Sequence, residues 1–172
     1  KDTVQEDIRQ VEKNLNDFYL TAGDTVTSEQ RALENYKAVA LTAMAAKIPV
    51  ALNGLDNINT ILTDNDAENY LSVGDISLIG ITKNDYNQAL PSLTLAQAGL
   101  AAAESVQTNE NITKALAETL SALNKTFSAL KDCYSMLEAS LVGSGFTQAE
   151  LDIYKTNISA QQTAVSTGIT SV

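Results

Sequence analysis

The sequence predicts an all-α fold: an elongated antiparallel helical bundle, or coiled-coil hairpin, with kinked helices. Two observations indicate this class. Apolar residues recur at alternating intervals of four and three in five segments, and alanine, which lets helix axes approach closely, is frequent beside them. Because the repeat is about 3.5 residues rather than 3.6, the helices should supercoil left-handedly. Most connections are short, so neighbouring helices are expected to be antiparallel.

The first two predicted helices are separated by a break near Gly23. The apolar positions of the first are Val4, Ile8, Val11, Leu15 and Phe18. The second is expected to begin after Thr27, which stands three residues before Gln30, the spacing of a capping box.

A proline interrupts the stripe of the second helix. This stripe comprises Leu41, Met44, Ile48, Ala51, Leu55, Ile58 and Leu62. Pro49 lacks a backbone N–H, so a kink is expected at residues 45–49. Residues 64–82 then break the helical pattern and predict the longest turn, or a small insertion.

The third predicted helix runs from Lys83 to about Glu104. Thr82 is its expected N-cap, and Pro91 either kinks it or delays its start.

The fourth predicted helix has the longest regular stripe in the chain. Its positions are Leu116, Leu120, Leu123, Phe127, Leu130, Tyr134, Leu137 and Leu141. The two glycines in residues 143–145 should end it. The last helix is expected to begin at a capping box formed by Thr147 and Glu150. It places Leu151, Tyr154, Ile158, Gln161, Val165, Gly168 and Val172 on one face.

The composition excludes several functions. With 11 basic and 21 acidic residues, the formal net charge of -10 disfavours binding to nucleic acids and to anionic lipids. The chain has no histidine and one cysteine, which removes histidine bases, Cys-His catalysis and internal disulfides. We therefore expect neither an enzyme nor a cofactor.

The chain is interpreted as one helical domain, residues 1–172, excised from a longer protein. It starts without methionine and ends inside a helical pattern. No uninterrupted run of 18 apolar residues occurs, so no transmembrane segment is expected in it.

Four carboxylates form the one weak metal candidate. Asp64, Asp66, Glu68 and Asp75 occupy positions one, three, five and twelve of a loop that resembles a calcium-binding loop. Asn69 stands where an EF-hand requires glycine, so a solvated polar turn is the favoured interpretation. Cys133 lies beside the apolar stripe without a histidine to activate it, and is interpreted as structural.

Three segments carry a resemblance to a known family: "YKAVALTAMAAKIPVALNGLDNINTIL" (36–62), "ITKALAETLSALNKTFSALKDCYSMLEASLV" (112–142) and "FTQAELDIYKTNISAQQTAVSTGITSV" (146–172). Together they resemble the helical region of HlyD-like membrane fusion proteins, the periplasmic adaptor subunits of secretion and efflux systems. The pattern L-D-x-Y-K-T-x-[IV]-S at residues 151–159 is the most characteristic.

This resemblance implies a non-catalytic helical spacer. In the family the helical region lies between two halves of a lipoyl-like domain and is followed by a β-barrel domain. The resemblance further implies an extracytoplasmic, membrane-anchored protein that forms homo-oligomers, with an inner-membrane transporter and an outer envelope component as partners. A partner contact is expected in residues 64–82, which take the place of the hairpin tip.

Two other classes remain open from the residues. The first is an extracytoplasmic four-helix sensor domain of a chemoreceptor or histidine kinase, although Arg9 and Arg31 are the only arginines available for an anionic ligand. The second is a surface or filament protein whose helices only assemble.

Overall fold

The computed structural model describes the backbone of residues 2–171 and the side chains of residues 10–171. It contains four helices, α1 (Asp2–Leu62), α2 (Ser77–Ser105), α3 (Asn109–Glu138) and α4 (Gln148–Thr170), and no strand within the described backbone. The predicted all-α class is confirmed. The chain divides into two compact units between Val39 and Ala40, and each unit is described by itself.

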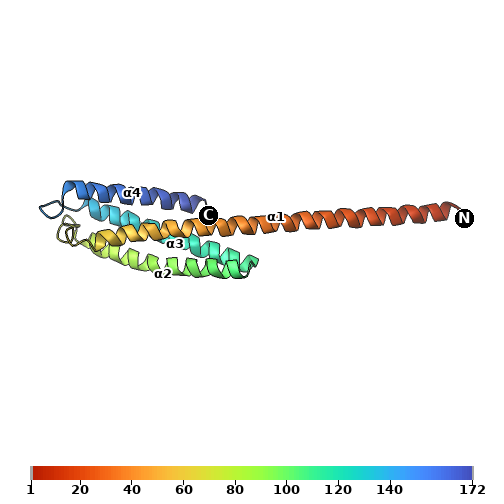
Figure 1. The fold of residues 1–172 in the computed structure, drawn as a ribbon, viewed down its shortest axis with the longest axis horizontal. Coiled ribbons are helices and arrows are strands. Elements are labelled where there is room, and N and C mark those ends of the chain that lie inside the picture. Colours follow the sequence, from red (N-terminus) through yellow and green to blue (C-terminus); the bar gives the residue numbers. More distant parts are fainter. Residues whose placement is uncertain (1, 172) are drawn as a thin grey trace. The chain divides into compact units, whose positions relative to one another are not determined.

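The second unit is an antiparallel four-helix bundle. Figure 1 shows the end of α1 beside α2, α3 and α4, with successive helices running in opposite directions. Its core takes residues from all four helices, including Leu55 of α1, Leu93 of α2, Leu130 of α3 and Ile158 of α4. These four side chains are between 0% and 4% exposed.

The buried face of α3 is wider than the predicted stripe. Leu123, Leu130 and Leu137 are buried as predicted, but Leu120 is 38% exposed. The rest of the buried face consists mostly of small residues at the same seven-residue repeat: Ile112, Ala115, Thr119, Ala122, Thr126, Ala129, Cys133 and Met136. Small side chains are needed here because α3 is packed against its neighbours on more than one side.

The predicted break at Gly23 is wrong, because α1 is continuous from Asp2 to Leu62. The Thr27 hydroxyl donates to the Gly23 carbonyl at 2.9 Å, so it bonds within the helix instead of capping a new one. Pro49 lies inside α1 as predicted. The described part of the chain therefore forms four helices where the spacing predicted five.

The start of α2 was predicted six residues too late. The helix begins at Ser77, whose N–H and hydroxyl both donate to the Asp75 carboxylate, at 3.0 and 2.6 Å. Thr82, the predicted cap, is a buried interior residue whose hydroxyl donates to the Leu78 carbonyl. Pro91 lies inside α2 and does not delay its start.

The capping box of α4 is confirmed. Thr147 Oγ1 accepts a hydrogen bond from the Glu150 N–H, and Glu150 Oε2 accepts one from the Thr147 N–H at 2.6 Å. The predicted α4 face is buried at Leu151, Ile158, Val165 and Gly168, whereas Val172 lies outside the described residues.

The end of α3 also differs from the prediction. The helix stops at Glu138, and Leu141 lies in the following loop with 56% of its surface exposed.

Two loops at one end of the bundle pack into an ordered tip, defined here as residues 63–76 and 139–147. The Gly74 N–H donates to the Ala139 carbonyl at 2.8 Å, and the Leu141 N–H donates to the Tyr70 carbonyl at 2.9 Å. The expected turn at 64–82 is thus confirmed in its first part, while its second part belongs to α2.

Candidate functional site

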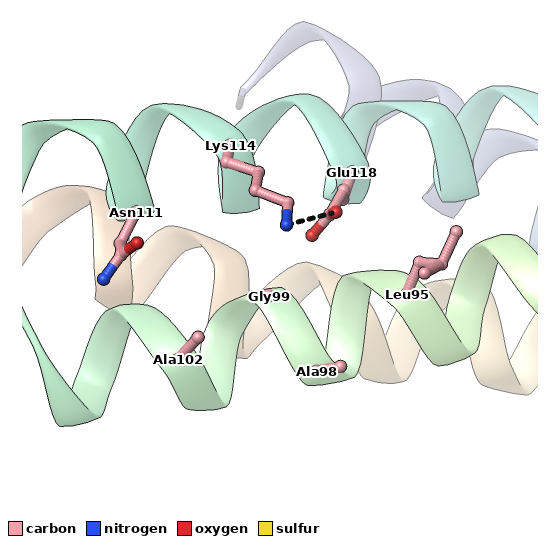
Figure 2. Close-up of a pocket in the computed structure, with 7 residues that line it drawn as sticks. All are labelled: Leu95, Ala98, Gly99, Ala102, Asn111, Lys114 and Glu118. Atoms are coloured by element: carbon pink, nitrogen blue, oxygen red, sulfur yellow. Dashed lines mark ion pairs between the residues drawn. The ribbon is translucent and has the colours of Figure 1, made fainter.

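A small cavity lies between α2 and α3. It has a volume of about 150 Å³ and is lined by Leu95, Ala98, Gly99, Ala102, Asn111, Lys114 and Glu118. Figure 2 shows the side chains of Lys114 and Glu118 extending from α3 over Gly99 of α2. Antiparallel packing of the two helices brings these residues together, because a three-residue connection, 106–108, joins α2 directly to α3.

Glu118 is the chemically distinctive residue of this cavity. Its Oε1 lies 3.9 Å from Lys114 Nζ, and its side chain is 20% exposed. Its Oε2 is buried and has no hydrogen-bond partner among the described residues. A Cβ on Gly99 would collide with this oxygen, so the missing side chain provides the space that the carboxylate occupies.

The arrangement offers a hydrogen-bond acceptor to a small ligand. A buried carboxylate oxygen without a donor is unfavourable, so a ligand that donates an N–H to Glu118 gains a hydrogen bond that the protein itself does not make. The cavity is well below the roughly 300 Å³ of an ordinary ligand pocket, which restricts such a ligand to the size of a short primary amine.

A pair of carboxylates spans α2 and α3 away from this cavity. Burial raises the pKa of Asp132, and its hydrogen bond and charge contact with Asp85 raise that pKa further, whereas Lys131 opposes the shift. Asp85 Oδ2 also accepts a hydrogen bond from the Ser128 hydroxyl at 3.1 Å. No sequence pattern indicates this pair, because the two carboxylates meet only through the packing of two separate helices.

Asp132→Asn is expected to stabilise the bundle near neutral pH. Because the folded state raises the pKa of Asp132, it binds this proton more tightly than the unfolded chain does. Stability therefore falls as the pH rises from the ordinary pKa of an aspartate through the raised value. Above that interval the variant should gain less than about 1 kcal/mol, since the side chain stays partly in solvent.

Urea unfolding between about pH 3 and pH 7 measures this effect. Asp56→Asn, at an exposed position of α1, is the matched control for the change in net charge. The coupling between Asp85 and Asp132 is contradicted if the free energy of unfolding rises equally in both variants at every pH.

Cys133 is fully buried in the bundle core. Burial raises the pKa of its thiol to about 12, so the reactive thiolate is strongly disfavoured at neutral pH. This position fits the structural role predicted for the residue.

The structure does not gather the four candidate calcium ligands. Asp64 accepts hydrogen bonds from the Tyr154 hydroxyl and from the Asp66 N–H. Asp75 accepts a hydrogen bond from the Ser77 N–H at the start of α2. The Tyr154 bond lowers the pKa of Asp64, followed by bonds from the Asp66 and Ala67 N–H groups, and burial opposes them. No group of three or more metal-ligating side chains that could hold an ion occurs among the described residues.

A second candidate site is an apolar face on the first unit. We define the N-terminal apolar face as Val11, Leu15, Phe18, Tyr19, Val26, Leu33 and Tyr36 of α1. These seven side chains are between 44% and 74% exposed. The sequence predicted Val11, Leu15 and Phe18 as apolar positions of the first helix, and in residues 10–36 only Ala22 is partly buried.

One described helix meets the length and composition of a membrane span. It is the Gln10–Leu62 part of α1, whose most apolar 18-residue window has a mean hydropathy of 1.5 and is 28% buried. This segment contains no uninterrupted run of 18 apolar residues, because polar residues occur throughout the helix. Core helices and signal sequences meet the same criterion, so this finding does not assign a location.

Comparisons with protein-family models, with curated proteins and with solved structures found no match to this chain. A functional interpretation therefore rests on its residues and their geometry.

Proposed function

We propose that the chain is a non-catalytic helical spacer and interaction domain of a HlyD-like periplasmic adaptor. The full-length protein would be anchored in the membrane, would form homo-oligomers, and would contact an inner-membrane transporter and an outer envelope component. The observation that carries the interaction role is the N-terminal apolar face, since a contiguous exposed apolar surface of this extent is typical of a binding site. The adaptor family is supported by the sequence resemblance.

The ordered tip supports the same proposal. Val73, Ile76, Leu141 and Val142 lie in or directly beside its two loops and are between 44% and 82% exposed. The two backbone hydrogen bonds between the loops connect one loop to the other. A spacer that presents a contact surface to a partner needs such pre-organisation.

The experiment that tests the family is to sequence the gene on both sides of this region. An adaptor requires two halves of a lipoyl-like domain around the helices, one membrane helix upstream, and a transporter gene nearby. If two membrane helices instead bracket the region and a signalling module follows, the protein is a sensor and not an adaptor.

The cavity in Figure 2 favours a second candidate, an extracytoplasmic sensor domain that binds a small ligand between helices. Thermal unfolding in the presence of short amines and amino acids separates the two functions. A sensor should show a rise in Tm that Glu118→Gln removes, because a ligand that binds only the folded state stabilises it. A spacer should show no change in Tm with any of these ligands.

A further inference from the structure

The N-terminal apolar face has the spacing and the area of a helix-pairing surface. Leu15, Ala22, Glu29 and Tyr36 recur every seven residues, and Tyr19, Val26 and Leu33 form a parallel series beside them. Two adjacent series with a seven-residue repeat are typical of a helix that packs along a second helix. The exposed parts of the seven large side chains offer on the order of 800 Å², close to one partner's share of a standard interface.

Glu29 is the one charged member of the first series. It is exposed, and it stands three residues after Val26 and four before Leu33, in the middle of the apolar face. A partner helix would remove this carboxylate from water, which is costly unless a positive charge is brought beside it. The carboxylate therefore restricts which helix can occupy the face.

The charges around the face disfavour two simple occupants, a parallel second copy and an anionic membrane. Residues 10–39 contain five acidic and three basic side chains, within a chain of net charge -10. A second copy in parallel register would place one Glu29 against the other, and like charges at such a position are destabilising. An anionic membrane surface would be repelled in the same way.

We propose that the N-terminal apolar face binds an amphipathic helix of another polypeptide, about four heptads long, that carries a lysine or arginine opposite Glu29. The apolar residues supply most of the affinity, and the pair with Glu29 selects the partner and fixes its register. This inference rests on the interaction role proposed above and is independent of the adaptor family.

Two synthetic helical peptides of about 28 residues test the charge preference. Both carry the same leucine heptads, and they differ only in one stripe position, which is lysine in one and glutamate in the other. Isothermal titration with the full 172-residue chain should show at least about tenfold tighter binding of the lysine peptide, a difference of about 1.4 kcal/mol. Glu29→Lys should reverse this preference.

Two variants serve as controls. Asp24→Lys makes the same change of charge on α1 but outside the two series, and should leave the preference as in the natural chain. Leu15→Ser combined with Leu33→Ser should abolish binding of both peptides. Both leucines are exposed, so circular dichroism should show unchanged folding of residues 40–171.

Three outcomes would overturn the proposal: equal binding of the two peptides, no binding of either, or self-association of the natural chain through the two leucines. Sedimentation equilibrium detects the third. Each leaves the gene-flanking test of the adaptor family unaffected. Conversely, flanking gene sequences that encode a sensor would contradict the adaptor family without affecting the expected charge preference of this face.

Discussion

Replacing Phe146 by alanine is expected to lower the free energy of unfolding by about 3–5 kcal/mol. Phe146 is fully buried although it lies in a loop between α3 and α4. Its ring centroid is 6.3 Å from that of Tyr70 and 5.9 Å from that of Tyr154. Truncation would leave a cavity between these two rings and would remove one of the residues that join the ordered tip to the bundle core, alongside Ala67 and Leu71.

Urea unfolding followed by circular dichroism measures this loss. Phe18→Ala is the matched control, because Phe18 is 66% exposed on α1 and its removal should change stability by less than about 0.5 kcal/mol. The buried role of Phe146 is contradicted if the two substitutions have similar effects. A shift confined to the local order of the tip, with an unchanged unfolding midpoint, would show that the tip does not contribute to global stability.

Local signals in the sequence predicted the helices better than they predicted the ends of those helices. The capping box at Thr147 and Glu150 was recognised because its chemistry lies within four residues. Gly23 predicted a break, but a helix tolerates one glycine at a cost of about 1 kcal/mol, and α1 continues through it. Thr82 has the residue type of a cap, yet α2 begins at Ser77 after the uncapped Ile76, and the Ser77 N–H and hydroxyl donate to the Asp75 carboxylate.

The buried face of α3 shows what spacing alone cannot determine. Large residues such as Leu120 define a stripe, but which side of a helix is buried depends on how many neighbours surround it. Ala122 and Ala129 are buried where helices approach closely, and their small side chains carried no hydrophobic signal of their own. The predicted seven-residue repeat of α3 is therefore correct, but the buried face is centred closer to the small residues than the predicted stripe of large residues.

The candidate sites depended on contacts between helices and were mostly invisible in the sequence. Glu118 looks like a surface residue until α2 is placed against it, with Gly99 leaving room for its carboxylate. The N-terminal apolar face was visible as spacing at Val11, Leu15 and Phe18. Spacing identifies a face that needs a partner, but it does not reveal whether that partner belongs to the same chain.

A substitution in the ordered tip is expected to have a second large effect on stability, through a steric collision and not through loss of buried apolar area. Gly143→Ala is expected to destabilise the protein by about 1–3 kcal/mol, the usual cost of forcing an extra carbon into a packed site. A Cβ at this position would collide with the ring of Tyr70. The Tyr70 ring has little freedom to move. The Tyr70 carbonyl accepts a hydrogen bond from the Leu141 N–H, and the Tyr70 ring packs on that of Phe146.

Gly145→Ala is the matched control for this prediction. The two glycines are separated by one residue, neither has a positive φ, and a Cβ on Gly145 would meet Tyr70 only at an ordinary contact distance of 3.6 Å. Backbone entropy should change similarly in both variants, so the difference between their urea midpoints isolates the steric effect. Tyr70→Ala should relieve the collision, so that Gly143→Ala costs much less in that background than in the natural chain. An undiminished cost there would mean that the backbone of the loop, rather than the tyrosine ring, excludes a side chain at this position.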